Sequence, residues 1–334
     1  MEYKYPAKVL ISGGKPSGGV ASFAESLRHG FSDLGLRTEV AENASILRRP
    51  GELRDPAVLK ILSLAAVFAA PVARRALCVA HGFPCVAYLG WPRALGILSS
   101  YRLANASGGA QLVAVSDYSA LQLRSIFGLR VDAAIRNPVL PAFLEPVPQA
   151  SSNRDAITYV GRLHRSKNVD RLLPAMRDVL DETPGLHAWI AGDGPMRESL
   201  EKLANGDKRI EFLGTLSPGQ VRERLRRTRV FLSANPTEPF GIAYLEALSQ
   251  GCAVAMPASG GGLEIAPELI GSRIQLFSVA ADRTSVASAL RRALSTTAAI
   301  PSLTASSANA VAKAYLAASA QFTSHGIFHP EANG

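Results

Sequence analysis

The sequence has 334 residues, which is too long for one ordinary core and suits two domains of roughly 150 residues each. Apolar residues make up 47% of the chain and charged residues 19%, a composition that excludes global disorder. The formal net charge of +9 admits nucleic acid, an anionic membrane face or a phosphorylated substrate as a partner.

The positive charge is concentrated in the front half of the chain. Residues 1–150 hold 16 Lys and Arg against 10 Asp and Glu, a balance of +6, whereas residues 151–334 hold 20 against 17, a balance of +3. Aromatic residues are 7% of the chain and do not cluster with the basic ones, so nucleic-acid binding is disfavoured.

The cysteines and the apolar stretches indicate the cellular compartment. Cys78, Cys85 and Cys252 are too few for a disulfide framework and lack the spacing of a metal knuckle, so we expect a reducing cytoplasm. The longest mostly apolar stretch, residues 61–73, is shorter than the roughly 20 residues that a membrane span needs. The first residues hold no apolar run of signal-peptide length.

The first half of the chain alternates predicted strands and helices. A buried strand over 7–12 leads through a glycine-rich loop into an amphipathic helix over 20–34. A second strand is expected within 77–83, and a third over 111–116 leads into a helix over 117–127. This alternation predicts a parallel, doubly wound sheet.

The proline-rich segment 137–154 is predicted to be an interdomain linker, after which the alternation resumes. Strands are expected over 156–161, 186–192, 210–214, 229–233 and 253–257, with helices over 168–181, from 195, from 217, from 241, over 284–295 and over 304–322. Ser217, Pro218 and Gln220 form a helix-start signal of the capping-box type. We therefore expect an α/β protein with domains 1–145 and 146–305, and a C-terminal helix in 306–334 that packs back on the first domain.

Two glutamates flank a predicted helix start in the second domain. In TEPFGIAYLEAL, Glu238 and Glu246 are eight residues apart, so they suit two hydroxyl-bearing ends of one elongated ligand. The amides of Phe240, Gly241 and Ile242 at the start of that helix can meet anionic or hydroxyl oxygens between them. The alternative is that Glu238 only caps the helix and Glu246 is a solvated helix residue.

Two cations follow the first strand of the second domain. Arg162 and Lys167 lie in VGRLHRSKN, beyond the carboxyl end of the strand over 156–161. Ligands of open α/β sheets bind at these ends, so both side chains are well placed for phosphate, although a basic loop is often only solvated surface.

These motifs resemble those of the retaining glycosyltransferases of family 4. GRLHRSKN, IAGDGP, FLGTLS, EPFGIAYLEAL and PASGGGLEI stand in the order and spacing of that family, and GGKPSGGVASF, AHG and VSDYSALQL resemble its front half. The resemblance implies the GT-B fold, in which two Rossmann-like doubly wound domains face each other across a cleft.

The resemblance also implies roles for individual residues. Glu238 would lie near hydroxyls of the transferred sugar, Glu246 on the ribose, and Arg162 and Lys167 on the diphosphate of a UDP- or GDP-sugar. His81 would lie near the donor sugar and the acceptor. The remaining donor-binding residues are Gly18 and Gly19 at the phosphates, Thr215 and Leu216 near the base, and the helix start formed by Phe240, Gly241 and Ile242.

The expected reaction is metal-independent transfer of a hexose-type sugar, with retention, to a glycan or lipid-linked acceptor. No Asp-x-Asp element lies on a suitable loop, so no metal or other cofactor is expected. Surface-polysaccharide or lipopolysaccharide assembly is a setting that the resemblance suggests. Alternatives that stay open are a nucleotide-sugar epimerase of the same fold and a non-catalytic GT-B binding subunit.

An anionic inner-membrane surface is a further expected partner. Four arginines flank the apolar segment 58–73, which could dock on such a surface or form a core helix. These arginines are Arg48, Arg49, Arg74 and Arg75.

Overall fold

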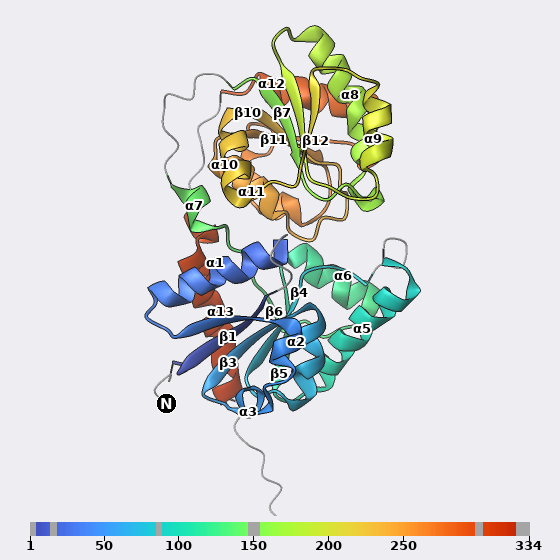
Figure 1. The fold of residues 1–334 in the computed structure, drawn as a ribbon. Coiled ribbons are helices and arrows are strands. Elements are labelled where there is room, and N and C mark those ends of the chain that lie inside the picture. Colours follow the sequence, from blue (N-terminus) through green and yellow to red (C-terminus); the bar gives the residue numbers. More distant parts are fainter. Residues whose placement is uncertain (1–4, 14–18, 85–88, 146–153, 298–302, 325–334) are drawn as a thin grey trace, which may run out of the picture. The chain divides into compact units, whose positions relative to one another are not determined.

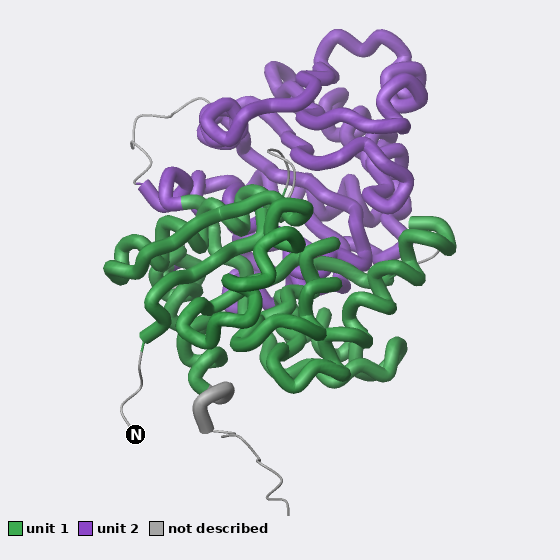
Figure 2. The backbone as a smooth tube through the Cα atoms, turned by 60° about the horizontal axis from the view of Figure 1, so that its bottom comes forward, with its two compact units in different colours: residues 1–140, 304–334 green, residues 141–303 purple. Residues whose placement is uncertain are grey.

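The computed structural model describes residues 5–13, 19–84, 89–145, 154–297 and 303–324 (Figure 1). The chain forms two compact units, one of residues 1–140 with 304–334 and one of residues 141–303 (Figure 2). The first boundary falls earlier than 145 because the short helix α7 (Pro141–Leu144) belongs to the second unit, where the Phe143 carbonyl accepts a hydrogen bond from Gln250 Nε2 at 2.7 Å.

The first unit is a parallel sheet with helices between its strands. In the described residues its strand order is β2-β1-β3-β4-β5-β6, a doubly wound arrangement whose order reverses between β1 and β3. The strands are β1 (Lys8–Gly13), β2 (Thr38–Glu42), β3 (Val58–Ser63), β4 (Ala76–Ala80), β5 (Ala110–Ala114) and β6 (Ala133–Ala134). The helices are α1 (Gly19–Asp33), α2 (Asn43–Ile46), α3 (Pro50–Arg54), η1 (Leu64–Val72), α5 (Trp91–Ala106), α6 (Asp117–Phe127), η5 (Thr304–Ser306) and α13 (Ala308–Ser324).

The segment 58–73 begins with a strand and not with the expected helix. Residues 58–63 form the central strand β3, every residue of which is buried, and η1 follows as a 3-10 helix. A run of apolar residues buried on both faces is typical of a parallel strand. The strand tolerates the buried Lys60 because its ammonium donates hydrogen bonds to two backbone carbonyls, those of Asp55 and of Arg74, the latter at 2.6 Å. Neither a core helix nor a docking segment is therefore formed by residues 58–63.

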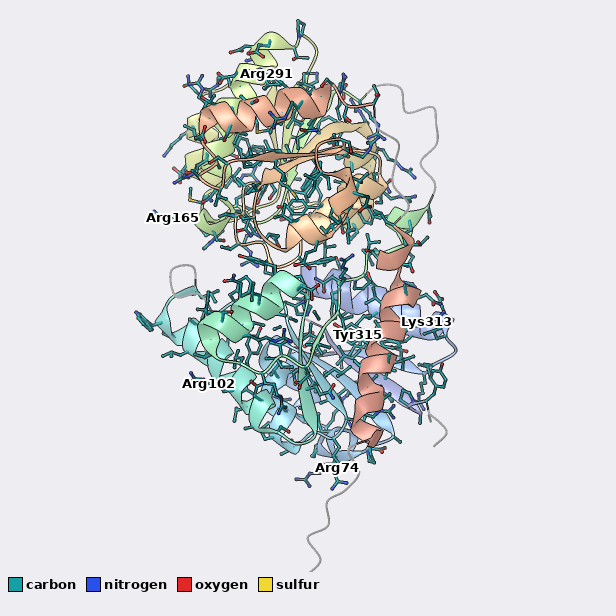
Figure 3. All side chains as sticks on the ribbon, turned by 180° about the vertical axis from the view of Figure 1, so that it is seen from behind. Arg74, Arg102, Arg165, Arg291, Lys313 and Tyr315 are labelled. Carbon is teal, nitrogen blue, oxygen red and sulfur yellow. The ribbon has the colours of Figure 1, made fainter. Side chains whose placement is uncertain are left out.

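Helix α13 packs along α1 within the first unit. Its Tyr315, labelled in Figure 3, is fully buried, and the ring lies 6.1 Å from that of Phe23 on α1. The C-terminal helix is therefore part of the first unit's core.

The second unit repeats the doubly wound plan with the strand order β12-β11-β10-β7-β8-β9 among the described residues. Its strands are β7 (Ala156–Val160), β8 (His187–Ala191), β9 (Ile210–Gly214), β10 (Thr228–Leu232), β11 (Ala253–Pro257) and β12 (Ile274–Phe277). Its longer helices are α8 (Val169–Glu182), α9 (Arg197–Ala204), α10 (Pro218–Arg227), α11 (Ile242–Ser249) and α12 (Arg283–Leu294). The order reverses between β7 and β10, so the crevice beyond the carboxyl ends of these two strands is the natural ligand position.

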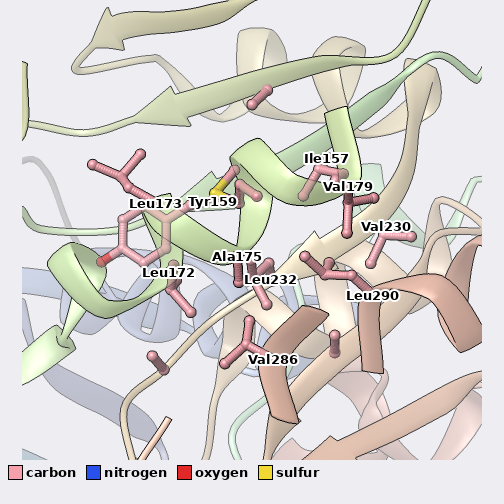
Figure 4. Close-up of a cluster of buried hydrophobic side chains, with 14 of the residues drawn as sticks. Ile157, Tyr159, Leu172, Leu173, Ala175, Val179, Val230, Leu232, Val286 and Leu290 are labelled. Carbon is pink, nitrogen blue, oxygen red and sulfur yellow. The ribbon is translucent and has the colours of Figure 1, made fainter. Parts of the chain in front are cut away.

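Apolar residues of strands and helices form the core of the second unit, part of which Figure 4 shows. Ile157 of β7 and Val230 of β10 lie with Val179 of α8 and Leu290 of α12 in one buried cluster. This core fixes the carboxyl ends of β7 and β10 relative to each other.

The expected alternation of strands and helices in both halves is confirmed, as is the two-domain Rossmann-like α/β fold. The helix expected over 117–127 is α6, and the capping box is formed by Ser217 and Gln220. No helix in the described part of the chain is long and apolar enough to cross a membrane.

Candidate functional site

The loop after β7 carries the two cations expected to meet a diphosphate. Arg162 is exposed, and Lys167 ends the short 3-10 helix η2 (Arg165–Lys167) just before α8. Arg165, on the same loop, is labelled in Figure 3. Asn168 has the left-handed conformation, with φ at 48°, which turns the chain from the loop into the helix.

Lys167 and Glu238 meet at the topological switch point. Lys167 Nζ lies 2.7 Å from Glu238 Oε2, so the loop after β7 is joined to the loop after β10 by an ion pair. The same carboxylate oxygen accepts a hydrogen bond from Asn235 Nδ2 at 2.8 Å. The side chains of Lys167 and Glu238 are 29% and 20% exposed, so the pair is partly shielded yet open to solvent.

Backbone contacts hold the loop after β7 in place. The Leu163 amide donates to the Asp193 carbonyl at 2.9 Å, and the Gly161 amide donates to the Ala191 carbonyl at 2.9 Å. A Cβ on Gly192 would lie 1.9 Å from the Gly161 carbonyl oxygen, so only glycine fits this approach. The IAGDGP segment therefore supports the cation-bearing loop from the next strand.

A left-handed glycine begins the helix that follows Glu238. Gly241 has φ at 93° and is the N-cap of α11, while the Phe240 side chain is buried beneath it. Among the described residues, the amides of Phe240, Gly241 and Ile242 donate no hydrogen bond, as expected for a first helical turn. These donors therefore stand at the switch point beside the ion pair.

The second glutamate lies one turn into α11. Glu246 is half-buried, and burial raises the pKa of its carboxyl to about 8. Its side chain accepts no hydrogen bond within the described ranges. Thr215 is exposed and Leu216 half-buried just after β9, which is the edge strand of the sheet.

Two buried tyrosines, Tyr159 and Tyr244, lie near enough to Glu238 to sense its charge. The Tyr159 hydroxyl donates to the Arg162 carbonyl at 3.0 Å, and burial raises the pKa of both Tyr159 and Tyr244, with a smaller contribution from the charge of Glu238. Both phenols therefore stay protonated near neutral pH.

In the first unit, His81 directly follows β4. Its Nε2 lies 3.0 Å from the hydroxyl of Ser63, and its ring stands edge-on to Phe23 with centroids 4.5 Å apart. Burial lowers the pKa of His81 to about 4, so the ring is neutral at physiological pH. Gly19 is the exposed first residue of α1, whereas Gly18 lies outside the described residues.

Sequence reasoning missed three residues at these positions. Tyr159 was expected only as a residue of the strand over 156–161, Ser63 only as part of the apolar segment 58–73, and no role was expected for Asn235. Asn235 could have been found from its position, because it is a polar residue three positions before Glu238. No local signal marks Ser63, because it meets His81 through the pairing of β3 with β4.

The chain's relatives are glycosyltransferases. Residues 144–301 match the family model described as glycosyl transferases group 1. The chain is 30% identical over 149 residues to the phosphatidylinositol N-acetylglucosaminyltransferase gpi3 subunit of Schizosaccharomyces pombe, covering 43% of this chain and 33% of that protein. It is 30% identical over 166 residues to sulfoquinovosyl transferase SQD2 of Arabidopsis thaliana, covering 49% of this chain and 31% of that protein. The matches thus span about a third of these relatives (33% and 31%).

Solved structures share the fold over nearly the whole chain. HepE of Anabaena, in complex with UDP and glucose, has a TM-score of 0.66 at 17% identity, covering 95% of this chain and 98% of that one. WaaG, a glycosyltransferase involved in lipopolysaccharide biosynthesis, also has a TM-score of 0.66, at 15% identity and with 95% of each chain covered. The resemblance to glycosyltransferases of GT-B fold is therefore confirmed: residues 144–301 match the family model of glycosyl transferases group 1, within a chain that has two Rossmann-like domains.

Proposed function

We propose that the protein is a glycosyltransferase that moves a hexose-type sugar from a UDP- or GDP-sugar to a glycan or lipid-linked acceptor, with retention and without a metal. The observation that carries the proposal is the Lys167–Glu238 ion pair at the switch point of the second unit, beside the start of α11, where the first amides have no acceptor among the described residues. A sugar nucleotide needs cations for its diphosphate and a carboxylate for sugar hydroxyls, and this site offers both.

The diphosphate gives these groups their task. When the bond between the sugar and the diphosphate breaks, negative charge grows on the phosphate that leaves. Arg162, Lys167 and the helix start at Gly241 would stabilise that charge, and preorganised donors of this kind contribute on the order of 3 kcal/mol each to lowering a barrier. Lys167 is held by Glu238 in the structure, so an arriving diphosphate would share or take this cation and leave Glu238 to accept from sugar hydroxyls.

The second glutamate would bind the nucleoside. A carboxyl that burial keeps protonated can donate to one ribose oxygen and accept from another hydroxyl. Thr215 and Leu216, beyond the end of β9, are the proposed neighbours of the base. Gly18, Gly19 and His81 stay proposed contributors from the first unit.

The donor and acceptor classes are supported by the relatives. HepE was solved with UDP and with UDP-glucose, and the S. pombe relative is named for a phosphatidylinositol acceptor. WaaG is named for lipopolysaccharide biosynthesis. We therefore propose a bacterial surface-glycan or glycolipid setting and a cytoplasmic enzyme that works at the inner membrane face.

A panel of UDP- and GDP-sugars tests the proposal. Thermal shift and mass-spectrometric product analysis should identify a nucleotide that stabilises the protein and is released with transfer of the sugar. Lys167→Ala should weaken the affinity for that nucleotide at least tenfold, because it removes one charge-assisted hydrogen bond worth about 1.5–3 kcal/mol.

Lys202→Ala is the matched control. Lys202 forms an ion pair of the same length, 2.7 Å, with Glu198, but both side chains are exposed on α9. This change should leave nucleotide affinity unaltered. Equal effects of the two substitutions, or no stabilisation by either UDP or GDP, would contradict the proposed function, and a new sugar nucleotide formed without an acceptor would indicate an epimerase.

A further inference from the structure

A basic pocket lies at the amino ends of the strands of the second unit. It has a volume of about 350 Å³, within the range of roughly 300–1,000 Å³ that small-molecule sites occupy. Residues before or at the start of β7, β10, β11 and β12 supply most of its lining, together with the end of α12. The lining residues are Arg154, Arg229, Gly251, Ala253, Arg273, Ala293, Thr296 and Thr297.

Three guanidinium groups dominate this pocket. Arg154 is held by backbone carbonyls, with distances of 2.8 Å to Thr228 O and 2.6 Å to Gln250 O. Arg273 is buried and donates to the Gly251 carbonyl at 2.8 Å. Because carbonyls carry no net charge, the two contacts of Arg154 fix the position of its cation without neutralising it.

Arg229 completes the set differently. It is the second residue of β10, its side chain is exposed, and it forms no hydrogen bond or ion pair with any residue in the described ranges. Its guanidinium is thus available to a ligand.

No carboxylate belongs to the pocket lining that the structure describes. Arg154 has no ion-pair partner there either, whereas other arginines of this unit, such as Arg209 and Arg291, face Asp or Glu at 2.7 Å. Burial, with a smaller contribution from the charge of Arg154, lowers the pKa of Arg273. Like charges gathered in a concave site favour an anion. Thr297 lies beside them, whereas the Thr296 hydroxyl already donates to the Ser272 carbonyl at 3.1 Å.

The pocket is separate from the proposed donor site. Lys167 and Glu238 follow the carboxyl ends of β7 and β10, whereas Arg154 and Arg229 stand at the amino ends of the same strands. At about 3.3 Å per residue, a five-residue strand puts roughly 16 Å between the two ends of the sheet. One diphosphate cannot reach both.

We propose that this pocket binds a second anionic ligand, a small molecule or headgroup that carries phosphate. Arginine guanidinium groups match phosphate oxygens in geometry and charge, and three of them suit a group with at least two negative charges. This inference does not rest on the proposed transferase activity.

Pyrophosphate titration tests the pocket apart from the donor site. The background is the full chain with Arg162→Ala and Lys167→Ala, which removes the proposed diphosphate cations, and ionic strength is held constant with chloride. We expect saturable pyrophosphate binding by calorimetry in this background. Adding Arg229→Ala should weaken it about tenfold, as expected for one lost charge-assisted contact, and Arg229→Lys should lie between the two.

Lys208→Ala is the control for net charge. Lys208 is exposed and precedes β9, at the other edge of the sheet, so this change should leave pyrophosphate affinity unaltered. The proposal is overturned if binding in the background does not saturate, or if Arg229→Ala and Lys208→Ala weaken it equally.

A second arm identifies the source of the phosphate. The protein is sedimented with vesicles of phosphatidic acid and phosphatidylcholine, and with vesicles of phosphatidylcholine alone. Sedimentation with only the first kind, lost on Arg229→Glu, would assign the pocket to a lipid headgroup. Arg229-dependent pyrophosphate binding with no such sedimentation would assign it to a soluble phosphate ester.

Discussion

Alanine in place of Gly241 should destabilise the second unit through two separate effects. The backbone of Gly241 has φ at 93°, which an L-residue adopts at a cost of about 1–2 kcal/mol. A Cβ at this position would also lie 2.3 Å from Cδ2 and 2.6 Å from Cε2 of Tyr244, so the ring must move.

The Tyr244 ring has little room to move. The ring is 4% exposed and stands edge-on to Phe231, with the ring centroids 5.9 Å apart. Gly262 lies against the ring as well, since a Cβ added to this glycine would be only 2.5 Å from Tyr244 Cε2. Overpacking of this kind costs about 1–3 kcal/mol. With the backbone effect, we expect a loss of about 3 kcal/mol, which for a unit of this size lowers its Tm by about 6–12 °C.

Tryptophan fluorescence can follow this unit within the full chain. Trp189 is buried in β8, whereas Trp91 of the first unit is already 67% exposed, so the change on unfolding reports mainly the second unit. Gly219→Ala is the control, because Gly219 lies in helix α10 and a Cβ there would meet nothing within 4 Å. That change should be neutral or stabilising.

A double variant separates the two effects. In a Tyr244→Leu background, Gly241→Ala should cost only the backbone part, about 1–2 kcal/mol. If Gly241→Ala instead shifts the Tm no more than Gly219→Ala does, the reasoning from the left-handed conformation and the ring contact is refuted.

Three further changes probe the titrating residues of both units. The pKa of His81 falls from 6.5 to about 4 on folding, so the unfolded state binds more protons between these pH values. Stability should therefore decline as the pH drops from 6.5 to about 4. His81→Gln should flatten this decline by up to about 1.4 kcal/mol per pH unit, measured as Tm against pH. The pKa of Glu246 rises from 4.5 to about 8 on folding, so stability should decline as the pH rises between these values. Glu246→Gln should reduce this decline by less than about 1.4 kcal/mol per pH unit, because the side chain is only half-buried. A variant whose Tm changes with pH in parallel with that of the unaltered protein would contradict the assignment. Ser63→Ala leaves Nε2 of His81 without its partner and should cost the first unit about 1–2 kcal/mol by calorimetry, whereas no loss would show that the 3.0 Å contact contributes nothing.

Local patterns predicted most helices and the strands that precede glycine loops. The helix over 117–127 has its N-cap Ser116 and its left-handed Gly128 in sequence, so both ends are encoded nearby. β3 was missed because residues 58–63 continue directly into the apolar residues of η1, so that the segment 58–73 was interpreted as a single element. The carbonyls of Asp55 and Arg74 that make the buried Lys60 tolerable are brought together only by the fold.

The candidate site was predictable to the extent that it depends on strand ends. Lys167 and Glu238 each follow a strand, so the sequence placed both at the correct edge of the sheet. Their contact at 2.7 Å depends on β7 and β10 being neighbours although 71 residues separate the two side chains, and that follows from the strand order.

The same dependence explains why the basic pocket had no signal in the sequence. Arg154, Arg229 and Arg273 stand before or at the start of three different strands and are far apart in the sequence. Only the order β12-β11-β10-β7 gathers them, since it places the starts of these strands side by side. A doubly wound sheet therefore concentrates side chains at both of its ends. An arginine that donates to backbone carbonyls at the amino ends is as informative as a cation at the carboxyl ends, because these carbonyls leave its charge for a ligand to neutralise.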